Sequence, residues 1–193
     1  MTRDRRLVAL HAEEIERLLG LLDARLRSRG VRASIYVVGG AAIAMTVVDT
    51  RRTVDVDAVA SEAVVMEEAR LLAEAEGIPT TWLNGNVGGW VPPRPADALA
   101  PPERLGLTVY YAPRDHLLAM KLIAARPQDK PDIVALSLAL GLGDRAEDYA
   151  DLLERVYHGE DSLEAVMGGR IRDVRAEAVS LGEMAVRLVQ GSR

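Results

Sequence analysis

Hydrophobic and polar positions follow two different periods along this chain. Through the first 29 residues leucine and isoleucine recur at helical spacing, and Gly30 ends the pattern. Ala33–Val38 is a continuous run of apolar, β-branched and aromatic residues, which is typical of a buried strand. Small apolar residues then predict a short buried helix over Ala41–Val48. Further strands are predicted at Val54–Val59, Thr80–Leu83 and Leu105–Tyr111.

The rest of the chain is predominantly helical in pattern. Glu62–Glu76 carries Val65, Ala69, Leu72 and Ala73 on one face. Asn84–Glu103 is rich in Gly, Pro and Asn and predicts a long loop. The remaining predicted helices are Pro113–Ala125, Asp132–Leu140, Arg145–Tyr157 and Ile171–Val189.

This order of elements predicts an α+β protein. A short mixed sheet with flanking helices would occupy residues 1–126, which include the N-terminal helix, and a helical segment packed on this core would occupy residues 127–193. A single domain over residues 1–193 is the alternative, because a chain of this length fits one domain.

The run Val54–Val59 carries two carboxylates, Asp55 and Asp57. Side chains alternate between the faces of a strand, so both carboxylates should share one face while Val54, Val56 and Ala58 point into the core. Carboxylates held side by side repel each other, and a divalent cation relieves that repulsion. Mg²⁺ is commonly bound by one or two carboxylates together with the phosphate oxygens of a substrate. The pair therefore predicts a metal–nucleotide site.

A second feature of this kind is the glycine pair Gly39-Gly40, which stands between a predicted strand and a predicted helix. Such a turn presents backbone N–H groups and the positive end of a helix to a phosphate, and the absence of Cβ atoms allows close approach. The two features lie close together in sequence, with 14 residues between Gly40 and Asp55.

Composition narrows the function classes. The chain has no cysteine, so disulfides and thiolate zinc sites are excluded, and its formal net charge of −5 argues against bulk electrostatic binding to nucleic acid. No apolar run approaches the roughly 20 residues of a membrane helix. We therefore expect a cytoplasmic protein without membrane contact.

The glycine pair followed by the carboxylate pair resembles the signature of the DNA polymerase β-like nucleotidyltransferase superfamily. The segment Arg52–Asp57, RTVDVD, is similar to the corresponding motif of minimal bacterial AbiEii-like nucleotidyltransferases and related uncharacterised families. Downstream, the helix with Lys121, followed by Arg126, Asp129 and Asp132, resembles the helical motif of those families. The similarity covers about Val37–Leu140.

The resemblance implies a nucleotidyltransferase fold and Mg²⁺-dependent (or Mn²⁺-dependent) transfer of a nucleotidyl group from an NTP to an acceptor hydroxyl. Asp55 and Asp57 would bind the metal, with Asp132, or else Asp129, as a third carboxylate. Gly39 and Gly40 would bind the triphosphate, assisted by Arg52, Thr53 and Lys121. The third predicted strand, where many members of the superfamily carry an acid, has none.

The resemblance leaves the acceptor open between tRNA, protein and a small molecule. A tRNA acceptor would need a basic groove, for which Arg94, Arg104, Arg114 and Arg126 are the candidates. Relatives of this kind occur in toxin–antitoxin and defence systems, so a cognate toxin or antitoxin, or a second copy of the chain, is an expected partner. The alternatives are a catalytically degenerate nucleotide-binding or antitoxin-like protein and an aminoglycoside-type enzyme.

Overall fold

The computed structural model describes residues 9–87, 89–95, 98–100 and 102–192. Within them the contacts divide the chain into two compact units. The first unit contains residues 9–87 and the described part of 95–112, and the second contains residues 89–94 and 113–192. The division falls after Ala112, whereas the sequence analysis placed the boundary after Arg126.

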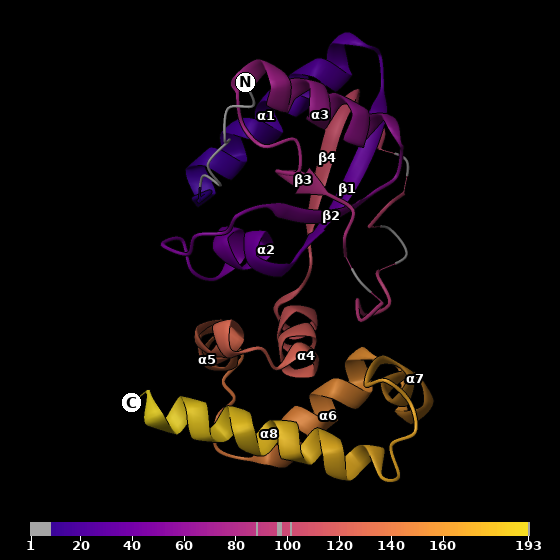
Figure 1. Ribbon diagram of the computed structural model, residues 1–193. Coiled ribbons are helices and arrows are strands. Elements are labelled where there is room, and N and C mark those ends of the chain that lie inside the picture. The colour runs from indigo at the N-terminus through magenta and orange to yellow at the C-terminus, as the bar shows by residue number, and fades with distance from the viewer. Residues whose placement is uncertain (1–8, 88, 96–97, 101, 193) are drawn as a thin grey trace, which may run out of the picture. The chain divides into compact units, whose positions relative to one another are not determined.

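The first unit is built on a mixed four-stranded sheet with the order β3-β2-β1-β4 (Figure 1). The central pair, β1 and β2, is antiparallel and aligns Val38 with Asp57. β4 is parallel to β1, and β3 is parallel to β2. The strands are β1 (Arg32–Val38), β2 (Val56–Ala60), β3 (Leu83–Asn84) and β4 (Gly106–Tyr111).

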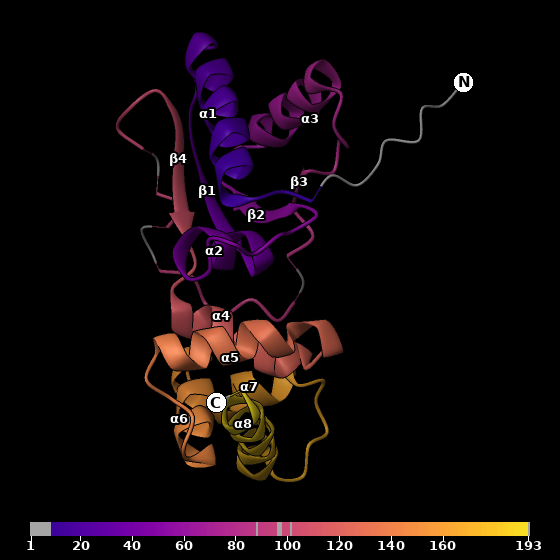
Figure 2. The same cartoon turned by 90° about the vertical axis from the view of Figure 1, so that its left-hand side faces the viewer.

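Helices α1 (Ala12–Ser28) and α3 (Val64–Glu76) contact each other and the sheet (Figure 2). Both bury one apolar face, as their periodicity predicts. Glu68 of α3 is buried and accepts hydrogen bonds from Arg25 of α1 and from Arg29, the residue that follows α1. These two guanidiniums outweigh the effect of burial and lower the pKa of Glu68, so the carboxylate ties the helices together in its charged form.

The second unit consists of helices. α6 and α8 make its most extensive contact, and α4 and α5 pack beside them. The hydroxyl of the fully buried Tyr157 donates to the carbonyl oxygen of Trp90 at 2.7 Å, which ties the segment 89–94 to this unit. The elements are α4 (Arg114–Ala124), η1 (Pro127–Asp129), α5 (Lys130–Ala139), α6 (Ala146–Val156), α7 (Glu160–Val166) and α8 (Val174–Gly191).

The predicted α+β class is confirmed, but two local predictions are wrong and one helix was not predicted. β2 begins at Val56 rather than Val54, and Val54 is 53% exposed instead of pointing into the core. The predicted strand Thr80–Leu83 is mostly a turn, and β3 covers only Leu83–Asn84. The helix α7 was not predicted. The start of the predicted N-terminal helix, residues 1–8, lies outside the described residues, and α1 begins at Ala12.

The described residues contain no helix with the length and apolar character needed to cross a membrane.

The crossing of α6 and α8 yields a test of the packing. A Cβ added to Gly182 of α8 would lie 2.3 Å from the carbonyl oxygen of Ala146, at the start of α6. Gly182→Ala should therefore push the helices apart and lower the free energy of unfolding by about 1–3 kcal/mol. Urea unfolding followed by far-UV circular dichroism measures this loss.

Gly191→Ala is the matched control in the same helix, because a Cβ there meets no atom within 4 Å. We expect it to change stability by less than about 0.5 kcal/mol. Equal effects of the two substitutions would show that the α6–α8 contact does not restrict residue 182.

Candidate functional site

The strand-to-helix turn lies beside a carboxylate. β1 ends at Val38, and α2 (Gly39–Thr46) begins at the next residue. Gly39 has a φ of +64°, and a Cβ at this position would lie 3.2 Å from Oδ2 of Asp57. A side chain at residue 39 would thus be strained by the backbone and crowded by the carboxylate. The turn requires glycine here, and it brings the start of α2 close to Asp57.

The second glycine of the turn lies beside a different part of the chain. A Cβ at Gly40 would lie 2.6 Å from Nη1 of Arg51 and 2.9 Å from Oγ1 of Thr53. The guanidinium of Arg51 and the hydroxyl of Thr53 therefore lie directly against the turn. Thr53 was among the predicted site residues, but Arg51 was not.

The carboxylates Asp55 and Asp57 are held in two different ways. Asp57 lies on β2, opposite Val38 of β1, whereas Asp55 stands just before the strand. Asn84 of β3 donates a hydrogen bond from Nδ2 to Oδ2 of Asp55 at 3.2 Å. Asn84 also aligns with Asp57 in the backbone pairing of β2 with β3. The sequence analysis did not assign Asn84 to the carboxylate pair.

The environment of Asp55 disfavours its charge. Burial raises the pKa of the Asp55 carboxyl, and the hydrogen bond from Asn84 offsets only part of that effect. A divalent cation would stabilise the deprotonated form, because it supplies the opposite charge that the half-buried carboxylate requires. The chemistry of this donor set, two carboxylates beside a glycine turn, fits a hard cation such as Mg²⁺.

The described residues contain no group of three or more His, Asp or Glu side chains that could hold a metal ion. The first unit thus offers a carboxylate pair rather than a complete cage. Substrate phosphate oxygens and water commonly complete the coordination of Mg²⁺ at such pairs.

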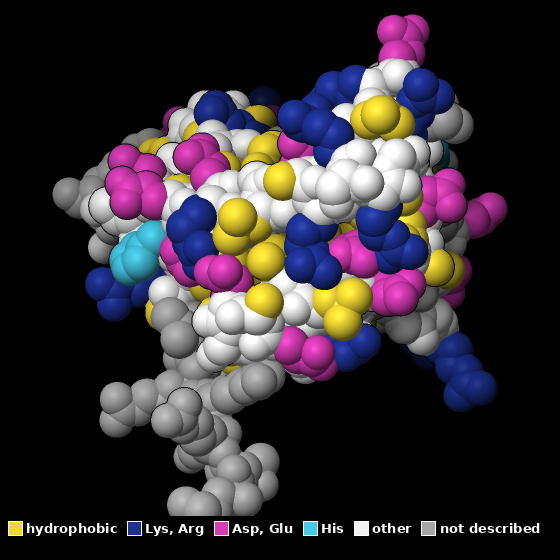
Figure 3. All heavy atoms as spheres, turned by 90° about the horizontal axis from the view of Figure 1, so that it is seen from above, with side chains coloured by type: hydrophobic (Ala, Val, Ile, Leu, Met, Phe, Trp, Pro, Cys, Tyr) yellow, Lys and Arg dark blue, Asp and Glu magenta, His cyan; other side chains and the backbone are white. Residues whose placement is uncertain are grey.

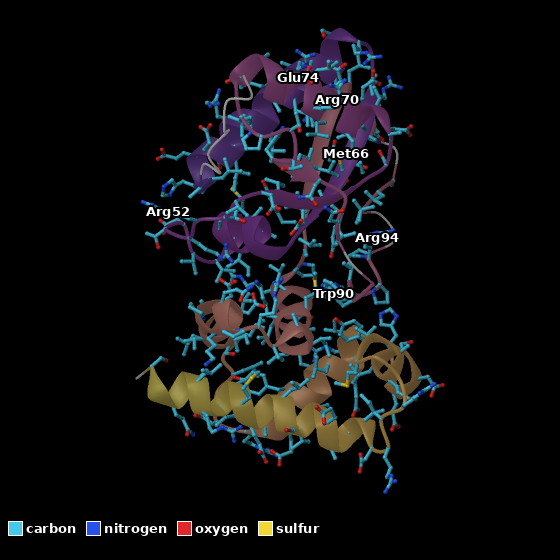
Figure 4. All side chains as sticks on the ribbon, viewed as in Figure 1. Arg52, Met66, Arg70, Glu74, Trp90 and Arg94 are labelled. Atoms are coloured by element: carbon cyan, nitrogen blue, oxygen red, sulfur yellow. The ribbon has the colours of Figure 1, made fainter. Side chains whose placement is uncertain are left out.

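Arg52, the arginine that sequence reasoning favoured, occupies a different place from Arg51. It is exposed and lines a hollow with His11, Glu13, Asp49 and other residues that precede or begin α1 or follow α2. Figure 4 shows its side chain at the outer edge of the first unit, beside the loop that follows α2.

Lys121 and Asp132 are brought together in the second unit. The ammonium of Lys121 lies 2.9 Å from a carboxylate oxygen of Asp132 and 2.5 Å from one of Asp129. Lys121 is only 6% exposed, and both aspartates are buried. Arg126 donates from Nε to Asp129 at 2.7 Å. The predicted phosphate-binding lysine and the predicted third carboxylate therefore form one buried ionic cluster, Lys121–Asp129–Asp132–Arg126, that joins α4, η1 and α5.

The cluster favours the charged form of Asp129. Burial alone would raise the pKa of its carboxyl, but the hydrogen bonds from Arg126 and Lys121 outweigh burial and hold the pKa below its usual range. A buried carboxylate of this kind depends on its cationic partners.

The candidate arginines for a basic groove belong to different units. Arg104 lies in the first unit, where it donates to the carbonyl oxygen of Leu107 and pairs with Asp23, whereas Arg94, Arg114 and Arg126 belong to the second. On the face of the first unit seen in Figure 3, basic and acidic side chains are interspersed. The arginines of α1 and α3, and Arg29 directly after α1, pair with nearby carboxylates; they are Arg17, Arg25, Arg27, Arg29 and Arg70.

Comparisons of the chain with protein-family models, with curated proteins and with solved structures find no match.

The ionic cluster predicts a large stability effect at Lys121. Lys121→Met would leave Asp132 and Asp129 buried without the shared ammonium, so we expect a loss of about 3–5 kcal/mol in the free energy of unfolding. Lys130→Met, at an exposed position nearby, should change it by less than about 0.5 kcal/mol. Urea unfolding measures both, and a small effect at Lys121 would contradict a stabilising cluster.

The raised pKa of Asp55 predicts a pH-dependent effect. The folded protein holds the Asp55 proton more tightly than the unfolded chain, so this carboxyl costs stability as the pH rises above its ordinary pKa of 3.8. Asp55→Asn removes that cost, and its amide oxygen can still accept from Asn84. The stability advantage of the variant over the wild-type protein should therefore grow as the pH rises from acidic to neutral. Unfolding curves at several pH values measure the difference, which would stay flat if burial of the charge had no effect.

Proposed function

We propose that the first unit binds a nucleoside triphosphate with Mg²⁺, or Mn²⁺, and that the protein transfers the nucleotidyl group to an acceptor hydroxyl. The acceptor oxygen attacks the α-phosphorus, the bond between that phosphorus and the bridging oxygen breaks, and pyrophosphate leaves. The hydroxyl proton passes to a base or to solvent. We also propose that the mixed sheet belongs to the nucleotidyltransferase fold.

One observation carries the proposal: the Gly39-Gly40 turn, the start of α2 and the carboxylate of Asp57 lie together, with Asp55 just before the same strand. The turn offers backbone N–H groups to a phosphate, and the carboxylates offer oxygens to a cation. The carboxylates would hold the Mg²⁺, and the N–H groups would bind the phosphates whose charge the metal balances, so a site that places both protein groups together suits a metal-bound nucleotide.

The residues have separate tasks in this reaction. Asp55 and Asp57 would hold the metal, which neutralises developing charge and orients the phosphates. Gly39 and Gly40 would accommodate the triphosphate. Lys121 and Asp132, which the resemblance assigns to phosphate and metal binding, belong to the second unit, where they form an ion pair with each other.

That ion pair also favours a second candidate, a nucleotide-binding or antitoxin-like partner protein that does not catalyse transfer. Lys121 and Asp132 already neutralise each other, and β4 carries no carboxylate. In this candidate the first unit binds nucleotide and the ionic cluster only stabilises the second unit.

Binding is tested by thermal unfolding with ATP, GTP, CTP or UTP and MgCl₂. A ligand that binds only the folded protein stabilises it by about 2.7 kcal/mol at a hundredfold excess over its Kd. At least one NTP should therefore raise the Tm by several degrees, and Asp55→Ala with Asp57→Ala should abolish the rise. An unchanged Tm with every NTP would contradict the nucleotide site.

Transfer is tested by incubating the protein with α-labelled NTPs and a panel of total tRNA, cell protein and small hydroxyl compounds. Label that enters one acceptor, and that requires Asp57, supports the enzyme. Binding without transfer to any class supports the second candidate.

A further inference from the structure

We infer that Arg51, rather than Arg52, is the cationic side chain that binds the phosphate tail of the ligand at the Gly39-Gly40 turn. This inference rests on the proposed function, and it names the chemical group that the turn selects, a polyphosphate.

The guanidinium of Arg51 lies directly beside the glycine turn. Nη1 of Arg51 lies 2.6 Å from the point that a Cβ of residue 40 would occupy. Any side chain at residue 40 would displace it. The absence of a side chain at Gly40 thus brings a cation next to the backbone N–H groups that begin α2. The positive end of the helix and the guanidinium favour the same kind of ligand, an anion.

Hydrogen bonds hold the Arg51 side chain and its loop in place. Its Nη1 donates to the carbonyl oxygen of Arg52 at 2.8 Å, and Thr53 donates from Oγ1 to the carbonyl oxygen of Asp55 at 3.0 Å. Thr53 is also joined to Leu10 by two backbone hydrogen bonds, of 2.6 and 3.0 Å. The segment that carries the arginine is therefore fixed to the chain before α1, which reduces the entropy that the side chain loses when it binds a ligand.

The carboxylates of Asp55 and Asp57 give the site negative charge, which opposes the binding of an anion. A triphosphate that approached Asp55 and Asp57 without cations would be repelled by both carboxylates. Mg²⁺ offsets part of this repulsion, and a guanidinium at the turn offsets a further part. Arginine suits this task because its planar fork of N–H donors matches the oxygens of a phosphate group. Arg52 is exposed and lines a hollow with Glu13 and Asp49, and the atoms nearest to a Cβ at Gly40 belong to Arg51 and Thr53 instead.

The experiment titrates the full chain with magnesium tripolyphosphate and with MgATP by isothermal calorimetry. Arg51→Gln should weaken binding of both by about tenfold to a hundredfold, the size expected for loss of a charge-assisted hydrogen bond. Arg51→Lys, which keeps the charge and loses the fork, should fall between Arg51→Gln and the wild-type protein. Arg70→Gln is the matched control, since Arg70 is an exposed arginine of α3 that pairs with Glu74.

Arg52→Gln decides between the adjacent arginines. A loss of affinity in Arg52→Gln that equals or exceeds the loss in Arg51→Gln overturns the inference in favour of Arg52. A lower Tm of unliganded Arg51→Gln with unchanged affinity overturns it as well, because Arg51 would then only hold the loop. If Arg51→Gln does not fold, an affinity of Arg51→Lys equal to that of the wild-type protein overturns the specific need for the fork.

The failure of the parent proposal gives a different result. If the wild-type protein binds neither MgATP nor any other magnesium NTP, both the proposed function and the inference fail. If the wild-type protein binds them and the Arg51 variants bind equally well, only the inference fails.

Discussion

The antiparallel pairing of β1 with β2 is the constraint on which the candidate site depends. It aligns Val38, the last residue before the glycine turn, with Asp57. A shift of this register by one residue would move Asp57 to the opposite face of the sheet. The buried side chains of β1 and the buried Val56 and Ala58 of β2 oppose such a shift, because it would expose the apolar residues of β2. Core packing thereby fixes the distance between the turn and the carboxylate.

The second unit must compensate for the burial of the Lys121 ammonium. An isolated ammonium in this environment would be costly to desolvate. Asp129 and Asp132 compensate for its charge, and Arg126 balances the additional negative charge of Asp129. The cluster joins the end of α4 to η1 and α5, so the charges also determine how the chain reverses between these helices. The short distances between these charges support a structural role for the cluster.

Long elements could be predicted from the sequence because their periodicity is continuous. The apolar face of α3, formed by Val65, Ala69 and Leu72, is buried as predicted. Two short elements, α7 and β3, could not be predicted in this way. α7 spans only Glu160–Val166 between glycine-containing turns, and β3 is two residues long and depends on its pairing with β2. Val54 was assigned inward because alternation was extended beyond the true start of the strand, where the Leu10–Thr53 bridge governs the backbone instead.

The carboxylate pair and the glycine turn were recognisable because residue type and order carry the information. The residues that lie beside them were not recognisable, because the conformation of the loops determines which side chains reach these positions. Arg51 and Arg52 are adjacent and chemically identical, and nothing in the order of residues indicates that the first lies against Gly40. Asn84 likewise is the second residue of the two-residue strand β3, in a segment that the sequence pattern predicts as a loop, so its contact with Asp55 depends on the tertiary fold.

The two carboxylates also differ in how firmly they are held. Asp57 belongs to the central β1–β2 pair, whereas Asp55 precedes the strand and its side chain is oriented by Asn84 of a short strand at the edge of the sheet. Short edge elements open at lower free-energy cost than central strands. Mg²⁺ requires near-octahedral ligand geometry, which a fully rigid pair would have to match in advance. We therefore expect the Asp57 side of the site to be preorganised with the glycine turn, and the Asp55 side to adjust its position when a metal-bound phosphate arrives.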